Sequence, residues 1–269
     1  MAGEVLHTDG APPSARGGFQ PGVGPPDAGS TVLWQTLRDA VSVLVTETGR
    51  AELDIVDVGG GTGGFAVPLG LLGHTVTVID PSPDSLAAAQ RRAAEAGVPL
   101  RAVQGDVSDL AATTGTVGAD LILCHSVLEY VESPEAAMSA IASILRPGGA
   151  VSVLAASAVA AVIHRVLTGR FDEARRLVAA TGTSSDPAAE SHVVLPRRFT
   201  LPDVVGLIER AGLRPGPEHG VRVFTDLVPS MLVDAEPGAV AALLALEETA
   251  SAHPAFRGMA TQFHVLGFR

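Results

Sequence analysis

The fold of this chain is decided by residues 53–64, which read LDIVDVGGGTGG. A short apolar run passes directly into a run of glycines, the order expected where a buried strand turns into a helix. Glycine permits positive φ and lets the backbone approach a ligand, and the first amides of the helix are free to bind one. A tight strand-to-helix turn without a ligand is the alternative interpretation.

From Leu53 onward, short apolar segments alternate with helical ones. We expect strands near 53–58, 75–80, 99–103, 119–125 and 149–155, with helices near 63–73, 84–97 and 134–146 between them. This alternation predicts an α/β fold, in which helices cover both faces of a mostly parallel sheet. Right-handed crossovers bring the carboxyl ends of the strands to one edge, where ligands of such sheets bind.

The rest of the chain has a weaker pattern. Residues 1–28 are rich in Gly and Pro and predict a flexible leader. A single domain is expected at 29–269, with its core at 50–155 and a C-terminal, substrate-side elaboration at 156–269. We further expect a helix from Ser30, a helical stretch at 157–180, a loop at 181–196, a helix from Thr200 to Gly212, strands at 221–224 and 263–268, and a helix at 238–251.

Composition restricts the range of functions. The formal net charge of −11 disfavours a long basic footprint on a nucleic acid, although a local arginine patch stays open. No apolar run reaches the ~20 residues of a membrane-spanning helix, so we expect a cytoplasmic protein without a membrane partner. The single cysteine, Cys124, lies in an apolar run typical of a buried side chain. No grouping of His, Cys or carboxylates has the spacing of a metal site.

The glycine turn suits two cofactors. Gly59, Gly61 and Gly64 fit the dinucleotide fingerprint, and Asp80 ends the next predicted strand, where a carboxylate can bind a ribose hydroxyl. These features are compatible with NAD and with S-adenosylmethionine, so an NAD-dependent oxidoreductase is one alternative. Asp57 favours S-adenosylmethionine, because a carboxylate at this position would repel a pyrophosphate but can meet the ammonium of a methionine moiety.

Two further segments point the same way. Gln104-Gly105-Asp106 follows the third predicted strand, where Asp106 can accept a hydrogen bond from an adenine amino group or cap a helix. Residues 145–149, LRPGG, close a helix before the fifth strand. With the glycine turn and Asp80, these segments make residues 30–155 resemble the class I S-adenosylmethionine-dependent methyltransferases. That resemblance implies a seven-stranded sheet with an antiparallel last strand, S-adenosyl-L-methionine as cofactor, Asp80 on the ribose hydroxyls and Asp106 near the adenine.

A narrower resemblance extends past this core. Segments 123–131, 164–172 and 220–226 are similar to the bacterial family that methylates carboxymethoxyuridine at the tRNA wobble position. That resemblance implies a cofactor site lined by Gly59, Gly60, Asp80, Gln104, Gly105 and His125, to which the glycine turn and the third strand add Asp57, Gly61, Gly63 and Asp106.

The chain departs from this family at two places. Residues 25–30, PPDAGS, contain no arginine where the family has one that contacts the cofactor. Ala155-Ala156-Ser157 stands where the family has an aromatic residue and an amide. Three interpretations therefore remain: a tRNA acceptor, a small-molecule O- or N-acceptor, and a cofactor-binding protein without turnover.

Three residues are candidates for contact with the acceptor. His125 ends the fourth predicted strand, where an imidazole can orient a substrate or act as a base, core packing being the alternative. Arg222 lies between Val221 and Val223, so in a strand it points to the opposite face, where it binds a substrate carboxylate or forms a surface salt bridge. Tyr130 faces the acceptor pocket or begins a helix.

The expected reaction is direct in-line attack of an acceptor oxygen on the donor methyl group. A carboxylate is already nucleophilic, so alignment and desolvation suffice. A hydroxyl or amine would need a base, and His125 is the first candidate for that role.

Overall fold

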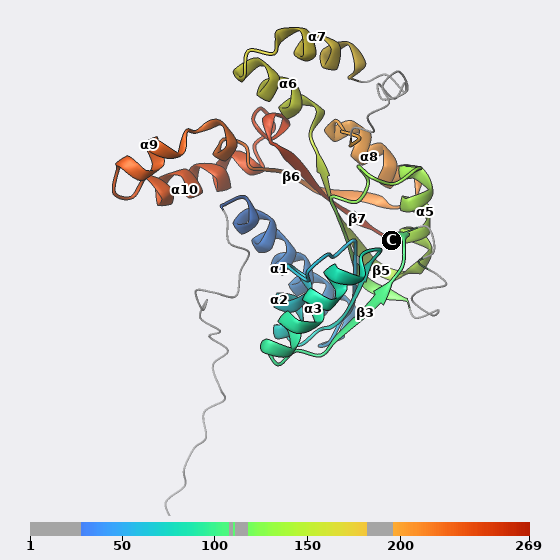
Figure 1. Ribbon diagram of the computed structural model, residues 1–269. Coiled ribbons are helices and arrows are strands. Elements are labelled where there is room, and N and C mark those ends of the chain that lie inside the picture. The colour runs from blue at the N-terminus through green and yellow to red at the C-terminus, as the bar shows by residue number, and fades with distance from the viewer. Residues whose placement is uncertain (1–27, 108–109, 111–117, 182–195) are drawn as a thin grey trace, which may run out of the picture.

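Seven strands form one sheet in the order β3-β2-β1-β4-β5-β7-β6 in a computed structural model that describes residues 28–107, 110, 118–181 and 196–269 (Figure 1). The strands are β1 (Asp54–Val58), β2 (Thr75–Asp80), β3 (Leu100–Gln104), β4 (Ala119–His125), β5 (Leu145–Ala156), β6 (Arg214–Val221) and β7 (Gln262–Phe268). Neighbouring strands from β3 to β5 pair in parallel, and β7 runs antiparallel to both β5 and β6. The expected α/β sheet with its antiparallel last strand is confirmed.

Helices cover both faces of this sheet. They are α1 (Ala28–Thr48), α2 (Ala66–Leu71), α3 (Pro83–Glu95), α5 (Pro134–Ile144), α6 (Ala158–Leu167), α7 (Phe171–Ala180), α8 (Leu201–Arg210), α9 (Ser230–Ala235) and α10 (Ala239–Ser251), with short 3-10 turns η3 (Thr225–Leu227) and η4 (Arg257–Met259). Successive strand residues point to opposite faces, so Ile55 packs in one core with α1 and α2, whereas Val56 packs in the other with α5 and α8.

Three helices begin at side-chain caps. The hydroxyls of Ser82, Ser133 and Thr200 each accept a hydrogen bond from the backbone N–H three residues later. A proline in the first turn follows each cap, where its missing N–H costs nothing. These caps fix where the helices start at the carboxyl edge of the sheet.

Two expectations are wrong in detail. The helical stretch at 157–180 is two helices, α6 and α7, because the chain turns at Gly169, which has a φ of +73°. The strand expected at 221–224 lies earlier, at Arg214–Val221, and it ends where Arg222 takes a φ of +61°. β6 is hard to predict from the sequence. It is an edge strand that pairs only with β7, and such a strand tolerates prolines, so its residues lack the apolar alternation of a typical strand.

Two other expectations fall outside the described residues: the leader, except for Ala28, and nearly all of the loop at 181–196. In the described part of the chain no helix is both long and apolar enough to span a membrane.

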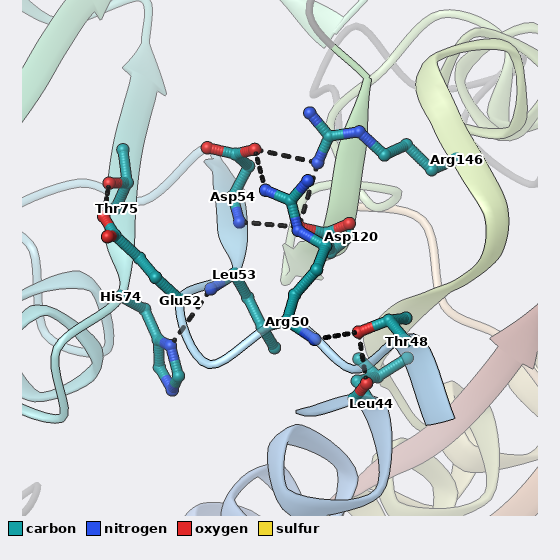
Figure 2. Close-up of polar contacts among 10 residues, drawn as sticks. All are labelled: Leu44, Thr48, Arg50, Glu52, Leu53, Asp54, His74, Thr75, Asp120 and Arg146. Atoms are coloured by element: carbon teal, nitrogen blue, oxygen red, sulfur yellow. Dashed lines mark hydrogen bonds and ion pairs between the residues drawn. The ribbon is translucent and has the colours of Figure 1, made fainter. Parts of the chain in front are cut away.

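An ion-pair cluster closes the amino edge of the sheet, opposite the glycine turn (Figure 2). The Asp120 carboxylate is almost fully buried and accepts a hydrogen bond of 2.8 Å from the backbone N–H of Asp54. Arg146 Nη1 lies 2.9 Å from Asp120 and 2.8 Å from Asp54, and Arg50 reaches both carboxylates from the end of α1. The cluster ties β1 to β4, the two central strands whose carboxyl ends carry the candidate site.

Four helices extend beyond the carboxyl edge. The pair α6 and α7 follows β5, and α9 and α10 follow β6, so both pairs project on the side where the strands end (Figure 1). Ligands of parallel sheets bind at this edge, which places the two helical pairs beside the candidate site.

Candidate active site

The glycine turn after β1 has the strained geometry that only glycine adopts easily. Gly59, Gly61 and Gly63 have φ values of +64°, +53° and +77°. Asp80 at the end of β2 holds the turn in place, because its two carboxylate oxygens accept hydrogen bonds of 2.9 Å from the N–H groups of Gly61 and Ser82. The remaining lone pairs of this carboxylate are free to accept from the hydroxyls of a ligand.

A cavity of about 320 Å³ opens beside this turn. Its lining joins residues from distant parts of the chain: Asp57, Gly59 and Gly60 at the end of β1, His125 and Ser126 at the end of β4, Arg222 after β6, and Gln262 at the start of β7. A concave site of this size is within the range of small-molecule pockets.

The other expected cofactor residues form a strip next to the cavity rather than its lining. The Gln104 side-chain amide donates to the Pro81 carbonyl at 3.2 Å, and the Gly105 N–H donates to the Asp80 carbonyl at 3.3 Å. Asp106 follows in an exposed position. The carboxyl ends of β2 and β3 therefore bring Asp80, Gln104 and Asp106 to the same edge.

Tyr130 does not line the cavity. It lies in a turn closed by a hydrogen bond from its N–H to the Val127 carbonyl, and 75% of its surface is exposed. Glu129 next to it is buried and accepts a hydrogen bond of 2.6 Å from the Ala156 N–H, which ties the end of β4 to the end of β5. Burial raises the pKa of the Glu129 carboxyl.

Asp57 is a buried carboxylate at the base of the cavity. Burial, and then the nearby charge of Asp80, raises its pKa to about 7. A Cβ on Gly60 would lie 2.6 Å from the Asp57 carboxylate, so glycine is required for this approach. A cationic ligand group in the cavity would favour the ionised form of Asp57, which makes the residue a suitable partner for an ammonium or sulfonium ion.

His125 is held by hydrogen bonding on one side of its ring. Its Nε2 lies 2.8 Å from Ser152 Oγ, which in turn lies 2.8 Å from His264 Nε2, and the Phe65 ring packs edge-on at 5.0 Å. Burial lowers the pKa of His125 to about 3, so the imidazole is neutral at physiological pH. A neutral ring adds no positive charge against a sulfonium ion.

Backbone strain concentrates on this cavity. Ser126 and Arg222, with φ values of +55° and +61°, are the only non-glycine residues with positive φ in the described chain, and both line it. The Ser126 hydroxyl accepts a hydrogen bond of 3.1 Å from the Gln262 amide. Arg222 pairs with Asp226, which also accepts a hydrogen bond of 2.6 Å from the Thr261 hydroxyl.

A buried glutamate stabilises the segment that follows Arg222. The Glu247 carboxylate accepts hydrogen bonds from the N–H groups of Val223, Phe224 and Thr225 and from the Thr225 hydroxyl, at 2.6–2.8 Å. It is 1% exposed, so these four donors replace the water that it loses. Glu247 thereby fixes the position of Arg222 at the cavity.

Four residues at the site are not marked by the motifs of the sequence: Ser126, Ser152, Glu247 and Gln262. Ser126 carried a usable signal, because it directly follows a predicted strand end. The others have none in the local pattern, since β5, β7 and α10 bring them to the site only through tertiary packing.

These residues fit S-adenosylmethionine. Asp57 provides the buried negative charge that its cationic groups require, Asp80 retains acceptor capacity for hydroxyls, and the neutral His125 is compatible with a sulfonium ion. Among the described residues no cluster of His, Cys, Asp or Glu has a metal-binding arrangement.

Comparisons with known proteins agree with this geometry. Residues 56–153 match the family model described as a methyltransferase domain. The tRNA 5-carboxymethoxyuridine methyltransferase of Escherichia coli (strain K12) is 31% identical over 198 residues, which cover 72% of this chain and 71% of that protein. The ubiquinone biosynthesis O-methyltransferase of Chromobacterium violaceum is 40% identical over 96 residues, covering 35% of this chain and 40% of that protein.

A solved structure shows the same fold. The magnesium protoporphyrin IX methyltransferase of Synechocystis PCC 6803 with bound SAH superposes with a TM-score of 0.56 at 14% identity, covering 90% of this chain and 85% of that one. Fold, site and similarity define the class: the protein is an S-adenosylmethionine-dependent methyltransferase of class I. Within that class, the chain belongs to the family of the tRNA 5-carboxymethoxyuridine methyltransferases.

Proposed function

We propose that this enzyme methylates a carboxylate, and that 5-carboxymethoxyuridine at a tRNA wobble position is the first acceptor to test, an activity expected in the cytoplasm. The observation that carries the proposal is the presence of Arg222 on the same cavity as Asp57 and His125. A guanidinium at the cavity can bind an acceptor carboxylate, while Asp57 attracts the cationic methionine end of the methyl donor. The name of the E. coli relative supports the same acceptor chemistry.

The protein residues have a limited task in this reaction. S-adenosylmethionine supplies a methyl group on a positively charged sulfur. Arg222 orients the acceptor carboxylate, Asp57 and Asp80 hold the donor, and the cavity walls exclude water. A carboxylate attacks without losing a proton. This agrees with the pKa of about 3 at His125, which makes that ring a poor general base at neutral pH.

A second candidate is O-methylation of a small hydroxyl compound. It is favoured by the position of His125 on the cavity, where the ring could accept a proton, and by the similarity to ubiquinone biosynthesis O-methyltransferases. The two candidates predict different products, because a methyl ester is cleaved by mild alkali and a methyl ether is not.

The experiment incubates the full chain and S-adenosylmethionine with an anticodon stem-loop that carries 5-carboxymethoxyuridine. Controls are a stem-loop with unmodified uridine, one with the corresponding carboxamide, and the free modified nucleoside. We expect mass spectrometry to detect an alkali-labile methyl group on the carboxylate substrate alone, with turnover lowered at least about tenfold in Arg222→Gln. If the free nucleoside is methylated equally well, the acceptor is a small-molecule carboxylate rather than tRNA. If no carboxylate is methylated, the proposal is refuted.

A small group of arginines beside the carboxyl edge is available for contact with an RNA. Arg165 lies in α6, Arg170 directly before α7 and Arg175 in α7, beside the carboxyl edge, and each pairs with an acidic residue of α7. Because few cations are grouped there, the salt dependence of stem-loop binding should be shallow.

A further inference from the structure

The two residues with strained backbones at the cavity, Ser126 and Arg222, follow β4 and β6. These strands are not neighbours, because β5 and β7 lie between them in the sheet. Two consecutive residues where β7 begins, Thr261 and Gln262, connect them: Thr261 contacts Arg222, and Gln262 contacts Ser126. The beginning of β7 therefore sets how these two parts of the cavity wall lie relative to each other.

Thr261 holds Arg222 in two ways. Its backbone N–H donates to the carbonyl of Arg222 at 3.1 Å. Its hydroxyl donates to Asp226 at 2.6 Å, and the other oxygen of that carboxylate pairs with the guanidinium of Arg222. Both the left-handed backbone of Arg222 and its charged group are thus tied to Thr261. Since Gln262 is the next residue, its side chain begins at a fixed place relative to Arg222.

The side chain of Gln262 extends along the cavity face of the sheet toward β4. Gln262 lies opposite Ala156 of β5 and Val221 of β6. Opposite residues of paired strands point to the same face, and the single methyl group of Ala156 leaves room for a longer neighbour. The Gln262 amide accordingly reaches Ser126 Oγ at 3.1 Å, beyond β5.

Gln262 keeps a hydrogen-bond donor for a ligand. A primary amide has two N–H groups and one carbonyl oxygen. In the described part of the chain, Ser126 is the only hydrogen-bond partner of this side chain. If the amide donates to Ser126, one N–H stays available, and if its carbonyl instead accepts from the hydroxyl, both do. Because Gln262 lines the cavity, at least one N–H can meet an acceptor there.

A carboxylate acceptor needs such a donor in addition to Arg222. A carboxylate has two oxygens that each accept hydrogen bonds, whereas the Arg222 guanidinium is shared with Asp226. The nitrogens of His125 are less suited, because Nε2 bonds to Ser152 and Nδ1 is shielded from solvent. The neutral amide of Gln262 supplies a donor without adding a positive charge near a cationic methyl donor.

We infer that Gln262 is an acceptor-binding residue whose amide N–H, together with the guanidinium of Arg222, holds the acceptor carboxylate. Thr261 is the positioning residue that, through Asp226, keeps these two donors beside each other. This inference rests on the proposed function and deepens it, because it adds a second group that recognises the acceptor. A methyl ester has lost the negative charge, so both donors hold the product less tightly than the acceptor, which favours its release.

Two replacements of similar length test the contact at Gln262. Methionine lacks hydrogen-bond donors, and glutamate lacks them and adds a negative charge. With the carboxymethoxyuridine stem-loop, we expect Gln262→Met to raise the acceptor KM about tenfold and Gln262→Glu at least about thirtyfold, with the KM for S-adenosylmethionine unchanged. Gln90→Met makes the same change at an exposed position of α3 and is the matched control, which should leave both KM values unchanged.

A second pair of variants tests the positioning role of Thr261. Thr261→Ser keeps the hydroxyl that bonds to Asp226, whereas Thr261→Val keeps the shape without the hydroxyl. We expect Thr261→Val to raise the acceptor KM about fivefold and Thr261→Ser to stay close to the wild type. Because Thr261 acts through Arg222, Thr261→Val should have little further effect in an Arg222→Gln background. The same loss in both backgrounds would overturn the positioning role.

The outcomes separate this inference from the proposed function. If the wild type methylates the carboxylate and Gln262→Met keeps the wild-type acceptor KM, the contact at Gln262 is refuted and the proposed function stands. Equal KM values for Gln262→Met and Gln262→Glu would also refute a contact with an anion. If circular dichroism shows that Gln262→Met does not fold, Gln262→Asn replaces it, because its amide is one methylene shorter, and the same rise in KM is expected.

A binding measurement covers the case in which the wild type methylates only hydroxyl acceptors. That result would refute the proposed function. Calorimetry of the free carboxymethoxyuridine nucleoside with the enzyme loaded with S-adenosylhomocysteine then compares wild type and Gln262→Met without turnover. Weaker binding to the variant would support the contact, and equal binding, or no binding to either protein, would overturn it.

Discussion

Replacing Asp57 by asparagine should stabilise the ligand-free enzyme and weaken its cofactor binding. The pKa of Asp57 rises from 3.8 to about 7 through burial and the charge of Asp80. A raised pKa means that the folded state binds the proton more tightly than the unfolded chain does. The free energy of unfolding of the wild type therefore falls as pH rises from about 4 to about 7, and it is level above that range.

The shift of about three pKa units corresponds to roughly 4 kcal/mol at alkaline pH. Asparagine has nearly the shape of the protonated acid and does not ionise, so it avoids this cost. Between about pH 5.5 and about pH 8.5, the stability advantage of Asp57→Asn should grow by ~2 kcal/mol. Urea unfolding of both proteins at several pH values measures it.

Cofactor binding should change in the opposite direction. Since a cationic ligand requires ionised Asp57, wild-type affinity should be about tenfold weaker at pH 6 than at pH 8. The amino group of the ligand itself titrates at a pKa of ~8, which also changes the affinity with pH. The informative quantity is therefore the ratio of the wild-type affinity to the Asp57→Asn affinity, because the titration of the ligand cancels in this ratio. Calorimetry with S-adenosylhomocysteine and S-adenosylmethionine provides this ratio. Unfolding curves that stay parallel across pH, together with a pH-independent affinity ratio, would refute the assignment.

Three further substitutions test other parts of the structure. Gly59→Ala places a Cβ 2.5 Å from Val127 Cγ2 at a φ of +64°, so we expect a loss of about 1–3 kcal/mol in urea unfolding and weaker cofactor binding; unchanged stability would contradict the backbone argument. Asp120→Ala leaves Arg146 without its buried partner and should cost about 3 kcal/mol, whereas Arg50→Ala, at an exposed position, should cost under ~1 kcal/mol; equal losses would contradict the cluster. Glu247→Ala should raise the KM of the acceptor and leave cofactor affinity intact, because it releases the segment after Arg222; a loss of cofactor affinity alone would exclude that role.

Local chemistry made part of this structure predictable. A positive φ is a property of one residue, so the glycines after β1 mark the turn wherever the rest of the chain lies. The caps at Ser82, Ser133 and Thr200 likewise act over three residues, and each helix starts directly after its cap. Buried parallel strands are continuous apolar runs, which is why β1, β2 and β4 were found within a residue of their bounds.

The late strands depended on tertiary context. β6 is an edge strand with little apolar alternation, so its position came from pairing with β7 rather than from its own pattern. The prediction of a strand through Arg222 failed for this reason. The left-handed backbone of Arg222, not strand alternation, brings its side chain to the cavity.

The sequence by itself determined the α/β order, the glycine turn and the carboxylates of Asp57 and Asp80, because these depend on residues close together in the chain. Only the tertiary structure decided the acceptor side of the site. His264 meets Ser152 across 112 positions, and Glu247 reaches the segment after Arg222 from another helix. Such contacts form only when separate elements pack against each other. The hydrophobic pattern of an element predicts its own helix or strand, but it carries no information on which polar side chains of other elements it will meet.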